Sequence, residues 1–420
     1  MHSLACFGVS RRNRSRTPSV RGAAAEPRRS SARSRVALVA HGIHDDGGME
    51  RVFAELVRRV HARYELIVIA SDLAPDLRPL VDWRRAPTLR RPAALRFLVF
   101  YAVGAVRLRR VRAGLVHTLG AIVPNKAEVV SVQFCHAAFR EAAGGLAPPG
   151  APPLRRLNTA AYRLLCMAAE RWSYRARRAA VFSPVSDGVA RELAHHYPEV
   201  PVAVARNGVD RRRFRPSSLA RKEVRRSVGA DEDELVALFV GGDWDRKGLA
   251  IAIEALAHAR LSTDRPLTLW VVGDGDRARF DGLARASGVE DRVRFLGRRR
   301  DTERFYCAAD VFVFPTFYEA FPLVALEAAA SALPIVSPLV NGIEELVGQD
   351  EGGITVERTS EAFGAALARL AESPHLRRKL AASARTRSAA FTWERSAAAV
   401  EAVYAEILGT PGRPPANLAA

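Results

Sequence analysis

Short apolar runs that alternate with helical patterns constrain the fold of this chain more than any other feature. The first run, residues 35–40 (RVALVA), precedes an amphipathic helical pattern at 49–62, and a second run follows at 66–70. Further runs of the same kind lie at 115–118, 129–132 and 179–182. Because such runs are typical of strands buried on both faces, their order predicts β-α-β units around a parallel sheet.

The same alternation starts again after residues 198–216, where the pattern breaks and we expect a hinge. Predicted strands lie at 235–240, 267–272, 293–296, 311–314, 334–336 and 353–356, and predicted helices at 248–260, 278–286, 302–308, 323–331, 343–347 and 361–371. A chain of 420 residues has room for two domains of this class. We therefore expect two doubly wound α/β domains, which bind ligands at the carboxyl ends of their strands.

The domain limits follow from these breaks. We expect a disordered basic extension at 1–34, a first domain at 35–205, a second domain at 206–388, a segment at 389–408 that holds a long helix, and a flexible tail at 409–420. Residues 1–34 contain eight arginines and one glutamate, without hydrophobic periodicity or the apolar core of a signal peptide. A misplaced start codon would explain this stretch equally well.

The composition excludes several classes of protein. The four cysteines lie far apart without a CxxC pair, which excludes a disulfide framework and a zinc knuckle and indicates a reducing, cytoplasmic compartment. No apolar run approaches 18 residues, so we expect no transmembrane helix. The net charge of +19 fits an anionic partner, such as nucleic acid, acidic lipid or a phosphorylated small molecule. A genome biased toward arginine would account for the charge equally well.

One segment narrows these possibilities. Residues 316–327 (TFYEAFPLVALE) resemble the E-x7-E signature of the family 4 retaining glycosyltransferases, which have the GT-B fold. Further matches follow in the family's order at 47–51 (GGMER), 206–210 (RNGVD) with Phe214, 241–248 (GGDWDRKG), 272–275 (VGDG) and 293–297 (VRFLG). The resemblance covers residues 35–408 and is weaker in the first half.

The resemblance implies a fold and an activity. The fold would be two Rossmann-like domains facing each other across a cleft, with a C-terminal helix that returns to the first domain. The activity would be transfer of a sugar, with retention, from a UDP- or GDP-sugar donor to a hydroxyl of a glycan or lipid-linked acceptor. The pathway implied is cell-envelope or polysaccharide biosynthesis. The nucleotide-sugar is a substrate, and we expect no cofactor.

The two glutamates of the signature are the strongest candidates for donor binding. Carboxylates are strong acceptors for hydroxyl groups, and eight residues of mostly helical chain separate Glu319 from Glu327 by roughly 10–12 Å. The resemblance assigns Glu319 to the donor sugar and Glu327 to the ribose. The free N–H groups of Ala320, Phe321 and Leu323 are expected to start a helix that binds an anion, with Pro322 in its first turn. The alternative is two solvated glutamates on a surface helix.

A cationic loop is expected to meet the diphosphate of the donor. Cations placed there stabilise the charge that develops on the leaving group. Lys247 matches the family's phosphate-contacting lysine, but the family's arginine five positions earlier is replaced by Gly242. Arg246 is the candidate substitute, as in lipopolysaccharide-core glucosyltransferases with an Arg-Lys-Gly variant. The alternative for Lys247 is a surface lysine at a helix start.

Other matching positions complete the predicted site. Gly47 and Gly48 would allow backbone N–H groups to approach the phosphate. Asn207 and Gly242 belong to matching donor-side segments, and base recognition is expected near Arg298. His136 matches a family histidine that lies near the donor sugar, and His117 ends another strand; the alternative for both is a hydrogen-bonded structural histidine.

Metal and dinucleotide chemistry are not expected. The pair Asp45-Asp46 lies in a loop and favours a turn over a DxD metal motif, so we predict a metal-independent enzyme. Residues 273–275 (GDG) suggest a dinucleotide fingerprint only superficially, because position 278 is alanine.

Residues 84–112 suggest contact with a membrane. Nine arginines surround the apolar stretch 97–106, which is too short to span a bilayer but would suit an anionic leaflet. The alternative is a core helix with arginines at its solvated ends. We expect cytoplasmic location with peripheral association.

Two other functions remain open from the sequence. A sugar-nucleotide epimerase would share the two-domain cleft without needing Glu319 and Glu327. A non-catalytic nucleic-acid-binding protein would fit the charge, but it would need aromatic residues interleaved with the arginines, and these are mostly lacking.

Overall fold

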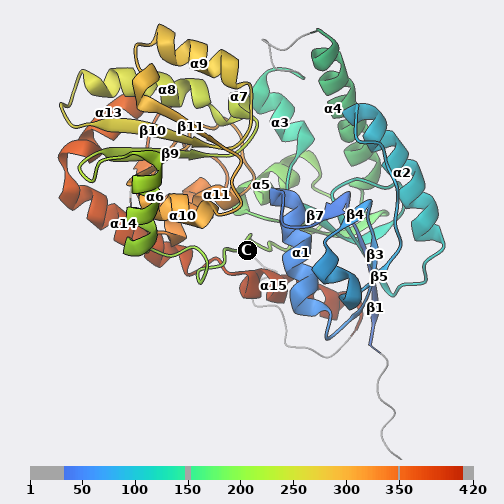
Figure 1. Ribbon diagram of the computed structural model, residues 1–420. Coiled ribbons are helices and arrows are strands. Elements are labelled where there is room, and N and C mark those ends of the chain that lie inside the picture. Colours follow the sequence, from blue (N-terminus) through green and yellow to red (C-terminus); the bar gives the residue numbers. More distant parts are fainter. Residues whose placement is uncertain (1–32, 147–152, 349–350, 410–420) are drawn as a thin grey trace, which may run out of the picture. The chain divides into compact units, whose positions relative to one another are not determined.

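A computed structural model of the chain describes residues 33–146, 153–348 and 351–409 (Figure 1). The predicted disordered extension at 1–34 and the tail at 409–420 lie outside these ranges, apart from residues 33, 34 and 409. The description below concerns the unit that begins at Ser34.

The first half of this unit is built on a six-stranded parallel sheet. Its strand order is β5-β3-β1-β6-β7-β8. The strands are β1 (Arg35–Val39), β3 (Glu65–Ile69), β5 (Asp82–Trp83), β6 (Leu115–Leu119), β7 (Ala127–Val132) and β8 (Ala179–Pro184). The helices are α1 (Gly48–Val60), the 3-10 helix η1 (Pro75–Leu80), α2 (Ala93–Arg109), α3 (His136–Ala143), α4 (Pro153–Ser173) and α5 (Asp187–His196), and β2 (Gly42–Ile43) pairs with β4 (Asp72–Leu73).

The second half repeats this plan in the order β11-β10-β9-β12-β13-β14. Its strands are β9 (Leu235–Val240), β10 (Leu267–Val272), β11 (Val293–Gly297), β12 (Val311–Val313), β13 (Ile335–Ser337) and β14 (Gly353–Thr355). Its helices are α6 (Ser218–Val228), α7 (Trp244–Lys247), α8 (Leu249–Arg260), α9 (Arg277–Ala286), η2 (Glu290–Arg292), α10 (Thr302–Ala308), α11 (Leu323–Ala330), α12 (Ile343–Val347), α13 (Ser360–Glu372) and α14 (Pro374–Ser388).

In both sheets, therefore, the order in which successive strands are added reverses at the central strands. Each sheet has the order 3-2-1-4-5-6 of a doubly wound fold, with the reversal between β1 and β6 in one and between β9 and β12 in the other. All the ladders are parallel, and every residue of β9 and β10 is buried, as the continuous apolar runs predict. Ligands bind at such reversals, beyond the carboxyl ends of the strands.

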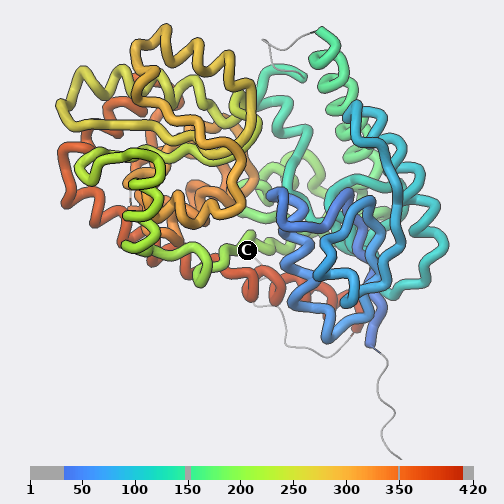
Figure 2. Tube along the Cα trace, viewed as in Figure 1, coloured from blue at the N-terminus to red at the C-terminus, as the bar shows by residue number. Residues whose placement is uncertain are grey.

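The last helix, α15 (Trp393–Ile407), packs on α1 of the first half, as predicted; its red ribbon lies beside blue α1 in Figures 1 and 2. Ion pairs join Arg59 to Glu394 at 2.8 Å and Arg63 to Glu401 at 2.6 Å. Gly208 allows the start of α15 to approach its backbone closely, because a Cβ at this position would lie 2.3 Å from the backbone nitrogen of Trp393.

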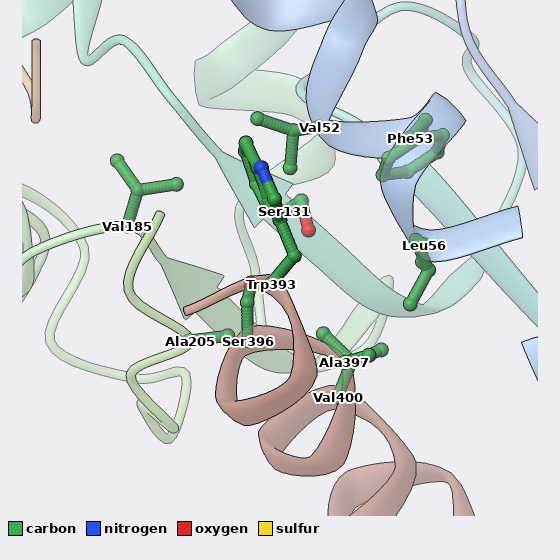
Figure 3. A pocket seen from close by; sticks show the side chains of 10 residues that line it. All are labelled: Val52, Phe53, Leu56, Ser131, Val185, Ala205, Trp393, Ser396, Ala397 and Val400. Carbon is green, nitrogen blue, oxygen red and sulfur yellow. The ribbon is translucent and has the colours of Figure 1, made fainter. Parts of the chain in front are cut away.

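A small cavity at this seam shows how tightly α15 is seated. Side chains of α1, β7 and α15 surround it, with Trp393 at its centre (Figure 3). Its volume is about 10 Å³, which is at most enough for one water molecule. The cavity is a packing gap without room for a ligand.

Most predicted elements are present, with ends shifted by one or two residues. The predicted hinge at 198–216 contains no helix, and its Val202 forms an isolated bridge with Phe182. Its role as a domain boundary stays a prediction. The elements that were not located from the sequence include α3 to α7, α14 and the two-residue strands β2, β4 and β5.

Helix α2 has both a core face and an exposed face. Phe97, Phe100 and Leu108 are buried, while Leu95, Leu98 and Val106 are 44%, 45% and 46% exposed. The alternative of a core helix thus holds for one face only. Among the described helices, none combines the length and apolarity needed to cross a bilayer.

Candidate active site

Two loops meet at the reversal point of the second sheet. The loop after β9 leads into α7 and carries Arg246, and the loop after β12 carries Glu319. Arg246 Nη1 donates to Glu319 Oε1 at 2.6 Å and to the carbonyl oxygen of Tyr318 at 2.8 Å, and its Nε donates to Asp243 Oδ2 at 2.9 Å. The ion pair therefore places both predicted donor-side groups at the edge where a doubly wound sheet binds its ligand.

Lys247 lies directly behind this pair. Its Nζ donates to the carbonyl oxygen of Val240 at 3.3 Å and lies 5.6 Å from the ring centroid of Phe314. Gly241 has a φ of +137°, and a Cβ there would come within 2.0 Å of Lys247 Nζ, so the turn needs glycine. Burial lowers the pKa of Lys247, and the charge of Glu319 opposes that shift. Lys247 therefore lies beneath the loop, where its Nζ holds a backbone carbonyl, and is not a solvated surface lysine.

The segment between the two glutamates differs from the prediction in one respect. Helix α11 starts at Leu323, and Pro322 is the residue before it, with an extended ψ of 116°. The carbonyl of Pro322 accepts from Ala325 N at 3.1 Å and from Leu326 N at 3.3 Å. Ala320 and Phe321 thus precede the helix, and the expectation that their N–H groups begin it, with Pro322 in the first turn, is wrong.

Glu327 is buried and fully engaged. Its Oε1 accepts from Arg51 Nη1 at 2.7 Å, and its Oε2 accepts from the hydroxyl of Tyr306 at 3.0 Å. The reading of Glu327 as a solvated surface residue is therefore wrong. Because Arg51 lies on α1, this ion pair joins the first half of the chain to the second.

His136 is the first residue of α3 and is held by Glu170 of α4. Its Nδ1 bonds Glu170 Oε1 at 2.8 Å, and its backbone N–H donates to the same oxygen at 2.9 Å. The hydroxyl of Tyr197 donates to Glu170 Oε2 at 3.2 Å. Burial alone would lower the pKa of His136, but hydrogen bonds to Cys166 and Glu170 and the charge of Glu170 outweigh it and raise the pKa to about 9. His136 is therefore an imidazolium at neutral pH.

A cavity of about 260 Å³ connects these groups. Its lining includes His136 and Glu170 from the first half and Asp243 and Arg246 from the second. Residues after β1 and after β6, the reversal strands of the first sheet, also line it. The two reversal points thus contribute to one cavity.

The remaining predicted residues lie around this cavity with different roles. Gly47 caps α1 and leaves room for Glu50, whose Oε2 would lie 2.1 Å from a Cβ at Gly47, while no atom lies within 4 Å of a Cβ at Gly48. Gly242 is exposed in the loop after β9. Arg298 follows β11, is exposed, and pairs with Asp46 Oδ1 at 3.3 Å.

Asn207 is buried and supports the segment that carries Glu319. Its Nδ2 donates to the carbonyl oxygen of Phe321 at 3.0 Å. This bond holds the segment that carries Glu319, so the structure gives Asn207 a structural contact and none with the cavity.

His117 has the structural role that was its alternative. It is completely buried, and its two ring nitrogens bond the hydroxyls of Tyr404 at 2.6 Å and Ser131 at 2.8 Å. Burial lowers the pKa of His117 to about 3, so the ring is neutral. The expectation that His117 ends its strand is wrong, because β6 continues to Leu119 and Tyr404 of α15 covers the ring.

The sequence analysis missed Arg51 and Glu170 as site residues. Arg51 lies inside the matching motif at 47–51, so its position was visible although its partner was not. Glu170 lies within α4, where an isolated glutamate is typical of a solvated face. Only the fold shows that it is buried against His136.

One group among the described residues has the geometry of a metal site. It consists of Glu141, His195 and His196, whose potential ligand atoms lie within 4.8 Å of one another. These residues belong to the ends of α3 and α5 and do not line the 260 Å³ cavity.

Comparison with known families agrees with this geometry. Residues 46–213 match the model of glycosyltransferase family 4, and residues 234–373 match that of the glycosyl transferases group 1. The chain belongs to the group 1 and family 4 glycosyltransferases. The two matches cover the two halves described above.

Relatives within this family of glycosyltransferases cover only part of the chain. D-inositol 3-phosphate glycosyltransferases from Streptomyces bingchenggensis and Actinosynnema mirum are 34% and 36% identical to it over 234 and 237 residues. These matches include 52% and 53% of this chain, and the chain spans about half the length of these relatives, 51% and 56%.

Solved structures of glycosyltransferases and a related synthase show the same fold over nearly the whole chain. WaaG, a glycosyltransferase involved in lipopolysaccharide biosynthesis, is 24% identical with a TM-score of 0.74, and covers 90% of this chain and 100% of its own. Sucrose-phosphate synthase from Thermosynechococcus elongatus is 21% identical with a TM-score of 0.72 and the same coverage. Anabaena HepE in complex with UDP-glucose is 17% identical with a TM-score of 0.64, covering 88% and 99%. The GT-B fold implied by the sequence is confirmed.

Proposed function

We propose that this chain transfers a sugar, with retention, from a UDP- or GDP-sugar to a hydroxyl of a glycan or lipid-linked acceptor in cell-envelope or polysaccharide biosynthesis. The observation that carries the proposal is that Arg246, which lines the same cavity as His136, pairs with Glu319 and is followed in the chain by Lys247. UDP-glucose in a protein of the same fold supports a nucleotide-sugar donor.

On the donor side, carboxylates would bind the hydroxyl groups and cationic side chains would bind the diphosphate. Glu319 would accept hydrogen bonds from the sugar hydroxyls, and Glu327 from the ribose. Arg246 and Lys247 would face the diphosphate, which gains negative charge as the glycosidic bond breaks, so they stabilise the transition state more than the ground state. In the absence of donor, Arg246 is neutralised by Glu319 and Asp243.

The protonation state of His136 limits its role. Because its pKa is raised to about 9, His136 carries a proton at pH 7 and cannot take one from the acceptor hydroxyl. It would donate a hydrogen bond to the donor sugar or the leaving group. The proton of the acceptor would then go to an oxygen of the leaving phosphate, which fits a retaining reaction without an enzymic nucleophile.

The proposal also covers the absence of a metal requirement and the association with a membrane. We propose metal-independent transfer, because Arg246 of the cavity wall and the adjacent Lys247 would supply the positive charge with which a metal would otherwise neutralise phosphate. We also propose peripheral membrane association through α2, whose exposed Leu95 and Leu98 lie among arginines. This would bring a lipid-linked acceptor to the cavity, since Phe97 of the same helix lines it.

Turnover of radiolabelled UDP- and GDP-sugars tests the function. Glu319→Ala and Lys247→Ala are each expected to lower transfer about 100-fold or more with unchanged thermal unfolding. The exposed-site controls Glu232→Ala and Lys126→Ala should retain wild-type rates. EDTA should leave the rate unchanged. Wild-type transfer in Glu319→Ala would remove that residue from the site, and C2 inversion without transfer would identify an epimerase instead.

A further inference from the structure

We propose that the 260 Å³ cavity is the acceptor subsite and that it takes a hydroxyl carried on an apolar body, such as an aryl or isoprenoid group. The proposal rests on the glycosyl transfer proposed above. It names the substrate class of that same site and disfavours a phosphorylated polyol or a free sugar as acceptor.

The wall of the cavity is mainly hydrocarbon. Aromatic and aliphatic side chains come from α2, α3, α4, the end of β6 and the segments that follow β6, β7 and α4, namely Phe97, Leu119, Ala121, Ile122, Phe134, Phe139, Tyr162 and Tyr174. An apolar cavity of about 150 Å³ is large enough to bind benzene. A volume of about 260 Å³ therefore has room for one or two rings or a short branched chain. Sugar acceptors need many hydrogen-bond partners, which such a wall does not offer.

The cations in the wall already have contacts of their own. Among the lining residues that the structure describes, Arg163, Arg246 and His136 are cationic. Arg163 donates to the carbonyl oxygen of Leu146 at 2.8 Å and lies 4.2 Å from the ring centroid of Phe139. Arg246 is bound to Glu319, and His136 to Glu170 at 2.8 Å. The donor diphosphate would use Arg246, so a phosphate on the acceptor would have to use Arg163, which already bonds a carbonyl oxygen and lies over the ring of Phe139.

Two buried polar atoms of the wall have no hydrogen-bond partner. They are Nδ1 of His41, just after β1, and Nε2 of Gln133, just after β7. Burial, with the nearby charge of Arg96, lowers the pKa of His41 to about 4, so its ring is neutral. A neutral imidazole nitrogen and an amide N–H suit a hydroxyl, which donates and accepts. Two such atoms fit an acceptor with one or two hydroxyls on an apolar body.

Binding to the full chain, measured by calorimetry with and without UDP, tests the substrate class. We expect saturable binding of 2-naphthol or farnesol and no measurable binding of myo-inositol 1-phosphate. The two apolar alcohols distinguish an aryl body from an isoprenoid one. Myo-inositol 1-phosphate binding as tightly as either alcohol would overturn the proposal, as would failure of both alcohols to bind.

Variants locate the binding. Ile122→Trp fills the cavity and should weaken binding of the tighter-binding alcohol at least tenfold. Leu261→Trp introduces the same residue at a position that is 85% exposed and should leave this binding unchanged. If Ile122→Trp lacks a cooperative unfolding transition, Ala121→Leu replaces it. Gln133→Met should weaken the hydroxyl compound about two- to tenfold. Binding that is unchanged when the cavity is filled would place the alcohol elsewhere and refute the proposal.

Donor hydrolysis by the wild-type chain separates the two proposals. Hydrolysis of a UDP- or GDP-sugar without any preference for apolar alcohols supports glycosyl transfer and refutes the acceptor class. Alcohol binding without hydrolysis or transfer of any nucleotide-sugar refutes the proposed function instead.

Discussion

At the scale of single residues, the contact between His136 and Glu170 sets the charge of the cavity. The hydrogen bond to Cys166 and the hydrogen bond and charge of Glu170 together raise the pKa of His136 to about 9 against the lowering effect of burial, so Glu170→Gln should lower this pKa. NMR titration of the His136 ring measures this directly. A titration in Glu170→Gln that matches the wild type would mean that Glu170 does not hold the proton.

The same contact predicts the pH dependence of stability. The pKa of His136 is raised on folding, so its contribution is complete below pH 6.5 and is lost as pH rises through about 9. A shift of this size corresponds to roughly 2–3 kcal/mol. The difference in unfolding free energy between wild type and Glu170→Gln should therefore be largest near pH 6 and shrink by pH 10. A constant difference across this range would contradict the assignment.

Residues within short motifs were easier to predict than their partners. Glu319, Lys247 and Arg246 could be identified because each lies in a contiguous segment with a known pattern. Glu170 and Arg51 contact residues 34 and 276 positions away in the sequence. Nothing local distinguishes such a buried charge from a solvated one, so only the fold reveals it.

At the scale of elements, α15 is fixed to the first sheet by a buried hydrogen bond. Tyr404→Phe removes the hydroxyl that lies 2.6 Å from His117 Nδ1 and leaves that nitrogen unsatisfied. We expect a loss of about 1–3 kcal/mol in the free energy of unfolding without a change in KM. The control Tyr64→Phe alters a neighbouring ring 5.4 Å from Tyr404 and should change stability far less. Equal losses in both variants would contradict this role.

The exposed face of α2 predicts binding to anionic vesicles. The wild-type chain should float with phosphatidylglycerol vesicles at low salt and less at high salt, because arginine attraction is screened. Leu95→Asp with Leu98→Asp should weaken binding about tenfold or more, since leucine burial is lost. Leu219→Asp alters a leucine on α6 that is 68% exposed, more than Leu95 or Leu98, and serves as the control. No flotation at low salt would count against membrane association.

Strands were predicted more accurately than several helices for a physical reason. A fully buried strand such as β9 is a continuous apolar run, and such a run has few other interpretations. Helix α14 is rich in arginine and buries only Leu380, Ala384 and Ser388, so its pattern is weak. Helix α11 starts at Leu323, as the predicted range 323–331 has it, but Pro322 was expected inside its first turn because proline suits both the first turn and the position before it.

At the scale of the whole chain, the two sheets share one strand order, and the residues of the predicted site lie mainly after their central strands. The sequence predicts this arrangement because alternating β and α patterns allow few topologies. It does not predict which side chains join the halves. That depends on the distance between two surfaces, which no local pattern encodes.

The ion pair of Arg51 and Glu327, at 2.7 Å and with side chains 25% and 7% exposed, should couple the halves strongly. A double-mutant cycle with Arg51→Ala and Glu327→Gln, measured by urea unfolding, is expected to give a coupling free energy of about 1–3 kcal/mol between the two side chains. The pair of Arg298 and Asp46 also joins residues of the two halves, at 3.3 Å with both side chains 61% exposed. Its coupling free energy should be close to zero because the pair is solvated. Saturating UDP or GDP should reduce the first coupling, because ribose at Glu327 must replace one of its present bonds. Equal coupling for both pairs would show that burial does not strengthen the contact, and insensitivity to both nucleotides would place the ribose elsewhere.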